Sequence, residues 1–200
     1  MKYSEFGGIR IKGMIGVSPV GDDTKLIAKV ASKIKCQSML DIGTGTGFIP
    51  IYLSNLGRKC TGLDINEYAI SCAKENARIN NVDCVFIRTD LFKKVKGKFD
   101  LITFNPPFGN SRSQKITKFL EIIKSLVPKD NNLIIVISYW LIKKSRQKLI
   151  ERFLRSVRKF LLKNGQVLIL LYPPEMHLIR NFPHQIVGRY KDFSLVALQF

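Results

Sequence analysis

MLDIGTGTGF, residues Met39–Phe48, decides the fold class of this 200-residue chain. An apolar strand runs into a turn that holds Gly43, Gly45 and Gly47, and the apolar residues after it predict a helix. Glycines in such a turn permit positive φ angles and let the backbone come close to a ligand. A strand, a glycine-rich turn and a helix in this order are typical of a nucleotide-binding α/β sheet.

The spacing of the glycines distinguishes a dinucleotide site from a site for a ligand that carries an amino-acid end. A dinucleotide site requires G-x-G-x-x-G/A, in which the third small residue packs the helix on the strand, and bulky Phe48 occupies that position here. Acidic Asp41 lies two residues before the first glycine. Its carboxylate could pair with the ammonium group of a ligand that carries an amino-acid end, directly or through water.

Strand-like and helix-like segments alternate along the rest of the chain, with no internal repeat or linker. We therefore expect a single α/β domain with a doubly wound, mostly parallel, seven-stranded Rossmann-like sheet and an antiparallel last strand. Residues 1–37 would form a helical lead-in, residues 38–108 the cofactor-binding half and residues 109–200 the substrate-side half. The predicted helices are Asp23–Ile34, Phe48–Asn55 and Glu67–Ile79. The predicted strands are Ser38–Ile42, Lys59–Leu63, Val82–Arg88, Phe99–Phe104, Gln166–Tyr172, Gln185–Tyr190 and Phe193–Phe200.

Positive charge is in large excess, because 33 Lys and Arg stand against 15 Asp and Glu and give a formal net charge of +18. The excess favours polyanionic partners such as RNA, although lysine-rich solvated surfaces give the same balance. The segment Lys143–Lys163 holds nine basic residues and one acid, and its apolar residues recur at helical spacing. It predicts an amphipathic helix with a basic outer face. Leu133–Trp140 before it fits either an added strand or a buried helical turn.

Two aspartates follow the second and third predicted strands, where open α/β sheets bind ligands. Asp64, 21 residues after Gly43, could accept hydrogen bonds from both hydroxyls of a ribose. Asp90 could accept from the amino group of adenine, while Ile65 and Leu91 could enclose the ring. Either aspartate could instead cap a helix or a turn.

Asn105-Pro106-Pro107-Phe108 follows the fourth predicted strand and carries the chemistry. Two prolines fix φ and remove two donors, so nearby carbonyls stay free as acceptors. An amide or an exocyclic amine brings two N–H groups, which the side-chain oxygen of Asn105 and the carbonyl of Pro106 could take one each. Phe108 could stack on the planar group. This arrangement would align a planar nitrogen for methyl transfer without a separate strong base.

From Asp41 through Phe108 the chain resembles protein-glutamine N5-methyltransferases of the HemK type, within the class I S-adenosylmethionine-dependent superfamily, and especially their short archaeal and eukaryotic branch. The motifs DIGTGTG, GLDIN, TDLF and GKFDLITFNPPF carry the resemblance, and VSPVGDDT at residues 17–24 is similar to a segment before the first helix of that family. The resemblance implies S-adenosyl-L-methionine as the cofactor. The residues expected to contact it are Asp41, Gly43, Thr44, Gly45, Gly47, Asp64, Ile65, Asp90, Leu91 and Asn105, and those expected to hold the substrate are Asn105, Pro106, Pro107 and Phe108.

The chain departs from that family where the substrate would bind. Phe108 stands where the glutamine enzymes usually have tyrosine, and residues 109–112 differ from their usual continuation. The same four-residue motif followed by glycine also occurs in enzymes that methylate the N6 amine of adenine in RNA. We therefore weigh glutamine methylation of a release factor first, RNA adenine methylation second, and a non-catalytic RNA-binding protein third. Both enzyme families include members that need a small zinc-binding activator subunit, which we also expect here.

Cysteine usage and hydropathy bear on the compartment. The four cysteines form no CxxC pair, so we expect buried, reduced thiols and no metal site. No apolar run reaches the roughly 18 residues of a membrane span, and the amino-terminal stretch MKYSEFGGIRIKGMIG lacks the apolar block of a secretory signal. We expect a cytoplasmic protein without membrane association.

Overall fold

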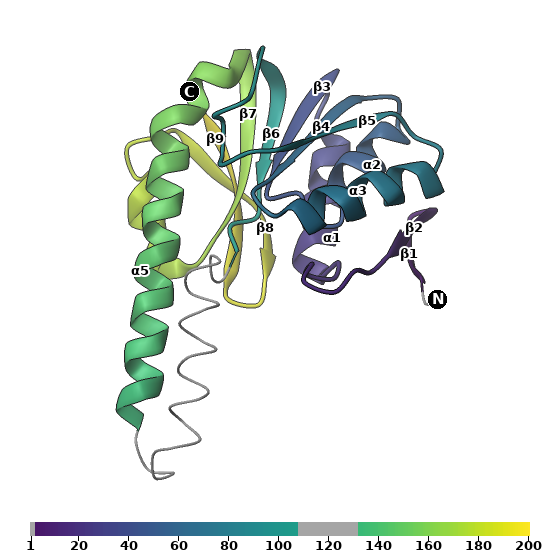
Figure 1. Ribbon diagram of the computed structural model, residues 1–200. Coiled ribbons are helices and arrows are strands. Elements are labelled where there is room, and N and C mark those ends of the chain that lie inside the picture. The colour runs from purple at the N-terminus through teal and green to yellow at the C-terminus, as the bar shows by residue number, and fades with distance from the viewer. Residues whose placement is uncertain (1–2, 108–131) are drawn as a thin grey trace. The chain divides into compact units, whose positions relative to one another are not determined.

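The structure of the protein is a computed structural model, which describes residues 3–107 and 132–200 (Figure 1). The chain forms two compact units. The first comprises residues 1–105 and 156–200 and contains all the strands of the described residues, and the second comprises residues 106–155. The division into a lead-in, a cofactor half and a substrate half remains a prediction.

The first unit is built on the seven-stranded sheet that the sequence predicts. Its strand order is β5-β4-β3-β6-β7-β9-β8. The strands are β3 (Ser38–Ile42), β4 (Lys59–Asp64), β5 (Cys84–Arg88), β6 (Phe99–Phe104), β7 (Leu161–Leu171), β8 (His184–Tyr190) and β9 (Phe193–Gln199). The first five are mutually parallel and β9 runs antiparallel to both of its neighbours, which confirms the predicted fold class.

The order of the strands fixes where a ligand can bind. The chain moves outward from β3 through β4 to β5, then returns to place β6 on the other side of β3. Ligands of open α/β sheets bind at such a switch point, beyond the carboxyl ends of the strands. The glycine turn follows β3 and Asn105 follows β6, so both lie at the switch point between these two strands.

Three helices, α1 (Asp22–Lys33), α2 (Phe48–Ser54) and α3 (Glu67–Ile79), cover one face of this sheet (Figure 1). Their apolar sides share one core with residues from the strands, because each amphipathic helix must bury its apolar stripe. The core includes Ile27, Ala28 and Ala31 of α1, Phe48 and Ile51 of α2, Ile70, Ala73 and Ala77 of α3, and Met39, Leu101, Leu168 and Leu195 of the strands.

A hairpin of β1 (Tyr3–Phe6) and β2 (Ile9–Lys12), which the sequence reading did not predict, precedes these elements. Gly7 and Gly8 form its turn with φ angles of 56° and 78°, as a two-residue turn with both centres in the left-handed region requires. The buried amide of Asn76 exchanges hydrogen bonds with the backbone of Lys12 and donates to the carbonyl of Thr46. These bonds hold the hairpin against α3 and the glycine turn.

The long helix α5 (Asn132–Val157) corrects two predictions. Leu133–Trp140 belongs to it, so the alternative of an added strand is wrong. The basic amphipathic helix ends earlier than expected, because a 3-10 turn at residues 158–160 follows it and β7 begins at Leu161, which pairs with Phe99. The apolar stripe Ile150, Phe153, Leu154 and Val157 is buried, and the basic residues Lys144, Lys148, Arg152 and Arg155 are exposed.

Candidate active site at the switch point

The glycine turn after β3 offers an open backbone. Gly43 and Gly45 have φ angles of 71° and 55°, and the side where a Cβ would project is empty at Gly45. At Gly43 the nearest atom to such a Cβ is the carbonyl oxygen of Asn105, at 4.0 Å. Gly47 differs, because its Cβ would lie 2.8 Å from the side chain of Ala73. The first two glycines leave room for a ligand, while Gly47 allows α2 to pack against α3.

Asp41 lies directly beneath this turn and is buried. The hydroxyl of Thr103 donates to its Oδ1 at 2.6 Å. Burial raises the pKa of Asp41 to about 7, the hydroxyls of Thr103 and Thr44 oppose the rise, and the nearby carboxylate of Asp64 adds to it. The Thr44 hydroxyl is also buried, and its geometry falls short of a normal hydrogen bond to any of the described residues. A buried carboxylate beside such a hydroxyl is a suitable place for an ammonium group.

Asp64 ends β4, and backbone amides hold both oxygens of its carboxylate. The amide of Gly45 donates to Oδ2 at 3.0 Å and the amide of Asn66 donates to Oδ1 at 2.9 Å. Burial raises the pKa of Asp64, while these amides oppose the rise. The bond to Gly45 joins the end of β4 to the glycine turn, so the structure brings these two parts of the predicted site together. Ile65 beside them is 61% exposed.

Asp90 and Leu91 follow β5 at the same end of the sheet. The carboxylate of Asp90 pairs with the ammonium of Lys93 at 3.1 Å. Leu91 has a φ of 50°, which is unusual for a residue with a side chain and is found where the surroundings impose it. The next residue, Phe92, is buried and stacks on Phe160 with ring centroids 4.6 Å apart. This stack anchors the loop that presents Asp90 and Leu91.

Asn105 is held by the start of α1, a contact that the sequence reading did not predict. Its Nδ2 donates to Oδ2 of Asp23 at 2.8 Å and to the hydroxyl of Thr24 at 3.4 Å. In the second unit, the guanidinium of Arg146 donates to the carbonyl of Pro106. Pro107 is exposed, and Phe108 lies outside the described residues.

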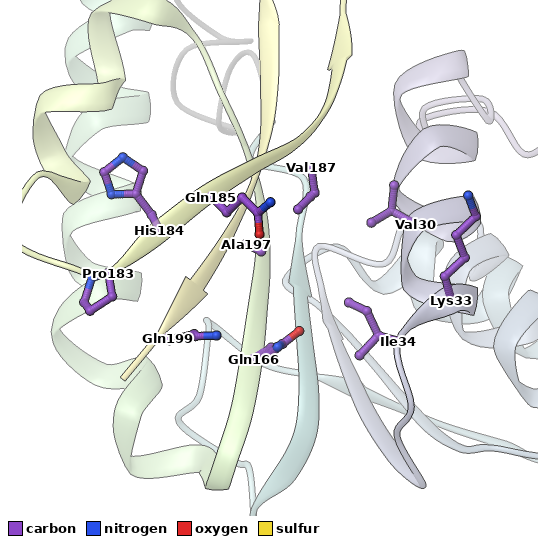
Figure 2. Close-up of a pocket in the computed structure, with 10 residues that line it drawn as sticks. All are labelled: Val30, Lys33, Ile34, Gln166, Pro183, His184, Gln185, Val187, Ala197 and Gln199. Atoms are coloured by element: carbon purple, nitrogen blue, oxygen red, sulfur yellow. The ribbon is translucent and has the colours of Figure 1, made fainter.

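A separate pocket of about 480 Å³ lies at the opposite end of the sheet (Figure 2). Gln166 at the start of the parallel part of β7, Gln199 at the end of β9 and Ile34 after α1 contribute to it. None of the predicted site residues lines this pocket. It therefore has no part in the cofactor site.

Known proteins with similar sequences show the family of this chain. Residues 12–170 match the methyltransferase small domain. The chain belongs to the methyltransferase small domain family. A candidate protein N5-glutamine methyltransferase of Methanocaldococcus jannaschii is 36% identical over 168 residues, which are 83% of this chain and 77% of that protein. The predicted enzyme class, a methyltransferase, is thus confirmed over the non-catalytic alternative.

Two further proteins are similar to this chain, one in sequence and one in fold. A release factor glutamine methyltransferase of Buchnera aphidicola is 33% identical over 123 residues, which are 58% of this chain and 44% of that enzyme, so the chain spans less than half its length. A 16S rRNA N2 methyltransferase of T. thermophilus, solved in complex with AdoMet and guanosine, superposes with a TM-score of 0.69 at 14% identity over 99% of this chain and 49% of that one. The second likeness shows the shared fold.

Three other predictions concern metals, thiols and membranes. The four cysteines are free, Cys60 and Cys72 being buried and Cys36 and Cys84 half-buried. Within residues 3–107 and 132–200 no group of three or more His, Cys, Asp or Glu is arranged to hold a metal ion. Over the same residues no helix has both the length and the apolar character that crossing a membrane demands.

Proposed function

We propose that this protein transfers a methyl group to the side-chain amide nitrogen of a glutamine in a protein of the release-factor kind. The cofactor is S-adenosylmethionine, which supplies a methyl group carried on a sulfonium sulfur. The observation that carries the proposal is the position of Asn105, which follows β6 at the switch point, with its carbonyl oxygen 4.0 Å from where a Cβ on Gly43 of the glycine turn would lie. This position supports a single site that holds both the substrate nitrogen and the cofactor.

The residues around the turn suit this cofactor in charge and in shape. Gly43 and Gly45 leave the backbone free to approach it. The carboxylate of Asp41 would pair with the ammonium of its amino-acid end, and Asp64 would accept from the ribose hydroxyls. Thr44 would use its buried hydroxyl at the same end as Asp41. The adenine ring would lie between Ile65 and Leu91 with Asp90 beside its amino group.

The substrate amide would be held by acceptors that point at its two hydrogens. Oδ1 of Asn105 would take one N–H, and the carbonyl of Pro106 would take the other. That carbonyl also accepts from Arg146, but an sp² oxygen has two lone pairs, so one remains. The two oxygens would stabilise the positive charge that develops on the nitrogen, and the proton would leave afterwards to water. Phe108 would stack on the amide plane.

Glutamine is favoured over adenine because the M. jannaschii relative covers most of this chain at 36% identity. To test the proposal, we would incubate the enzyme and labelled S-adenosylmethionine with a release factor and with ribosomal RNA. Label that survives nuclease, and that a Gln→Ala change in the acceptor protein removes, is the expected result. Label that nuclease releases as methylated adenine would replace the proposal with the RNA alternative.

RNA adenine methylation is the second candidate, and one surface of the first unit would suit RNA as a partner. Stacking of Phe92 on Phe160 and pairing of Phe99 with Leu161 bring two basic segments together at the amino ends of β6 and β7. We call this surface the basic edge. It consists of the exposed residues Lys94, Lys96, Lys98, Arg158, Lys159 and Lys163, which lack an ion-pair partner in the described part of the chain. Phosphates would bind there, whether the RNA is the substrate or carries a bound protein substrate.

A small zinc-binding activator subunit remains part of the proposal. Among the described strands β5 is an edge strand, and its Val85 is 55% exposed. An edge strand with an exposed apolar side chain can pair with a strand of another protein. Replacing Val85 by Lys should abolish co-purification with such a subunit while leaving the fold intact. Full solubility and activity of the isolated chain would remove the subunit from the proposal.

A further inference from the structure

The side-chain amide of Asn105 has one orientation that suits methyl transfer and one that does not. With Oδ1 toward the substrate it accepts from the substrate N–H. With Nδ2 toward the substrate, Asn105 would present two hydrogens to the substrate nitrogen, which also carries two hydrogens. The backbone alone cannot choose between these, because the two ends of an amide have nearly the same size and shape.

Asp23 makes this choice in the structure. Its Oδ2 lies 2.8 Å from Nδ2 of Asn105, and a carboxylate can only accept. Turning the amide over would bring Oδ1 against that carboxylate, where two acceptors repel each other. The hydroxyl of Thr24, 3.4 Å from the same nitrogen and 3.5 Å from Oδ1 of Asp23, can donate to Asp23 while accepting from Asn105. Both partners therefore favour the same orientation.

The carboxylate of Asp23 is itself placed by the start of α1. It folds back over Gly21, where a Cβ would lie only 2.2 Å from its Oδ1, so this conformation requires a glycine before the helix. The neighbouring acid, Asp22, is exposed and pairs with Lys25 at 2.9 Å instead. Two consecutive aspartates in one helical turn thus serve different partners, and only Asp23 reaches the acceptor residue.

We propose that Asp23 is a positioning residue that turns the side-chain oxygen of Asn105 toward the substrate nitrogen. The inference rests on the proposed function, in which Asn105 accepts from the substrate. Asp23 contacts Asn105 and would act on the substrate through it. Its loss should lower kcat, since misorientation of a group that contacts the reacting atoms costs about 10- to 100-fold. Cofactor affinity should not change.

The test compares Asp23→Ala, Asp23→Asn and the matched control Asp22→Ala in the full chain. Asp23→Ala should lower kcat about 10- to 100-fold, with an unchanged cofactor Kd by calorimetry. Asp23→Asn should keep most of the activity, because the introduced amide oxygen still accepts from Asn105. Asp22→Ala should behave as wild type. Wild-type kcat in Asp23→Ala, or equal damage in Asp23→Asn and Asp23→Ala, would overturn the inference.

A second measurement separates this inference from the proposed function. The side-chain N–H groups of Asn105 should exchange slowly with solvent in the wild type and rapidly in Asp23→Ala, as seen by NMR of the nitrogen-labelled protein. This readout needs no substrate. If exchange becomes fast in Asp23→Ala but no glutamine is methylated, the proposed function is refuted while the Asp23–Asn105 hydrogen bond is supported. Equal exchange in both proteins would refute the positioning role even if glutamine is methylated.

Discussion

Thr103 donates from its hydroxyl to Oδ1 of Asp41 at 2.6 Å, and both side chains are buried. The hydroxyls of Thr103 and Thr44 do not offset the loss of water around this carboxylate, so burial raises the pKa of Asp41 to about 7. The folded protein thus holds a carboxyl group whose ionisation lowers the free energy of unfolding. A buried carboxylate that binds a positively charged ligand is expected to lower the stability of the fold in this way.

The first prediction concerns stability. Because the folded-state pKa of Asp41 exceeds the ordinary 3.8, the native state binds more protons than the unfolded one between pH 4 and 7. Stability should fall as pH rises through this window. Asp41→Asn removes the ionisation, so at pH 8 it should raise the free energy of unfolding by about 2–4 kcal/mol. Denaturant unfolding at pH 4 and pH 8 checks this, and equal differences at both pH values would contradict it.

A second prediction is that cofactor binding releases a proton below pH 7. An ammonium group beside Asp41 favours the carboxylate, which must therefore lose its proton when the ligand arrives. Affinity for S-adenosylmethionine should weaken by up to about tenfold for each pH unit below 7. Calorimetry in buffers of different ionisation enthalpy measures the proton, and the signal should be absent in Asp41→Asn. Affinity that is independent of pH would show that Asp41 does not meet the ammonium.

The third prediction separates two glycines of one turn. Gly45→Ala introduces a side chain into open space, so it should weaken cofactor binding and cost about 1–2 kcal/mol of stability through its positive φ. Gly47→Ala also forces a Cβ against Ala73, which should raise the loss to about 2–4 kcal/mol. Thermal unfolding and equilibrium binding distinguish the two variants. Equal stability losses would contradict the packing role of Gly47.

The fourth prediction concerns the basic edge. Neutralising Lys94, Lys96 and Lys98 to Gln should weaken RNA binding and lower the slope of log K against log salt by about 2 to 3, since each phosphate contact contributes about 0.7–0.9. A control that neutralises Lys29, Lys33 and Lys74, exposed lysines of α1 and α3, removes the same charge elsewhere. An equal loss in both variants would mean that net charge acts without a defined surface.

Local patterns predicted most of the sheet. Strands Ser38–Ile42 and Phe99–Phe104 and helix Glu67–Ile79 have the predicted bounds, because buried apolar runs and a capping residue mark their ends. The hairpin of β1 and β2 escaped prediction, since its four-residue strands carry Glu5 and Arg10 and are held by amides far along the chain. The start of β7 at Leu161 escaped because apolar residues at helical spacing continue into the strand.

The sequence could predict which residues lie at the strand ends of the site, but it could not predict the hydrogen bonds between them. Asp41, Gly43, Asp64 and Asn105 could be named because parallel strands bring their carboxyl ends together. The bond from Asn105 to Asp23 joins residues 82 positions apart, and no local pattern reports such a pair. The raised pKa of Asp41 likewise depends on burial, which its neighbours in the sequence do not reveal.

The central claim is that Asn105 presents a glutamine amide to the methyl group of S-adenosylmethionine. The most direct test is mass spectrometry of a release factor after reaction with the wild-type enzyme and with Asn105→Ala. We predict one added methyl group on the side-chain nitrogen of a single glutamine with the wild type, and an unmodified peptide with the variant. A methyl group found instead on adenine of ribosomal RNA, or glutamine methylation that persists in Asn105→Ala, would contradict the claim.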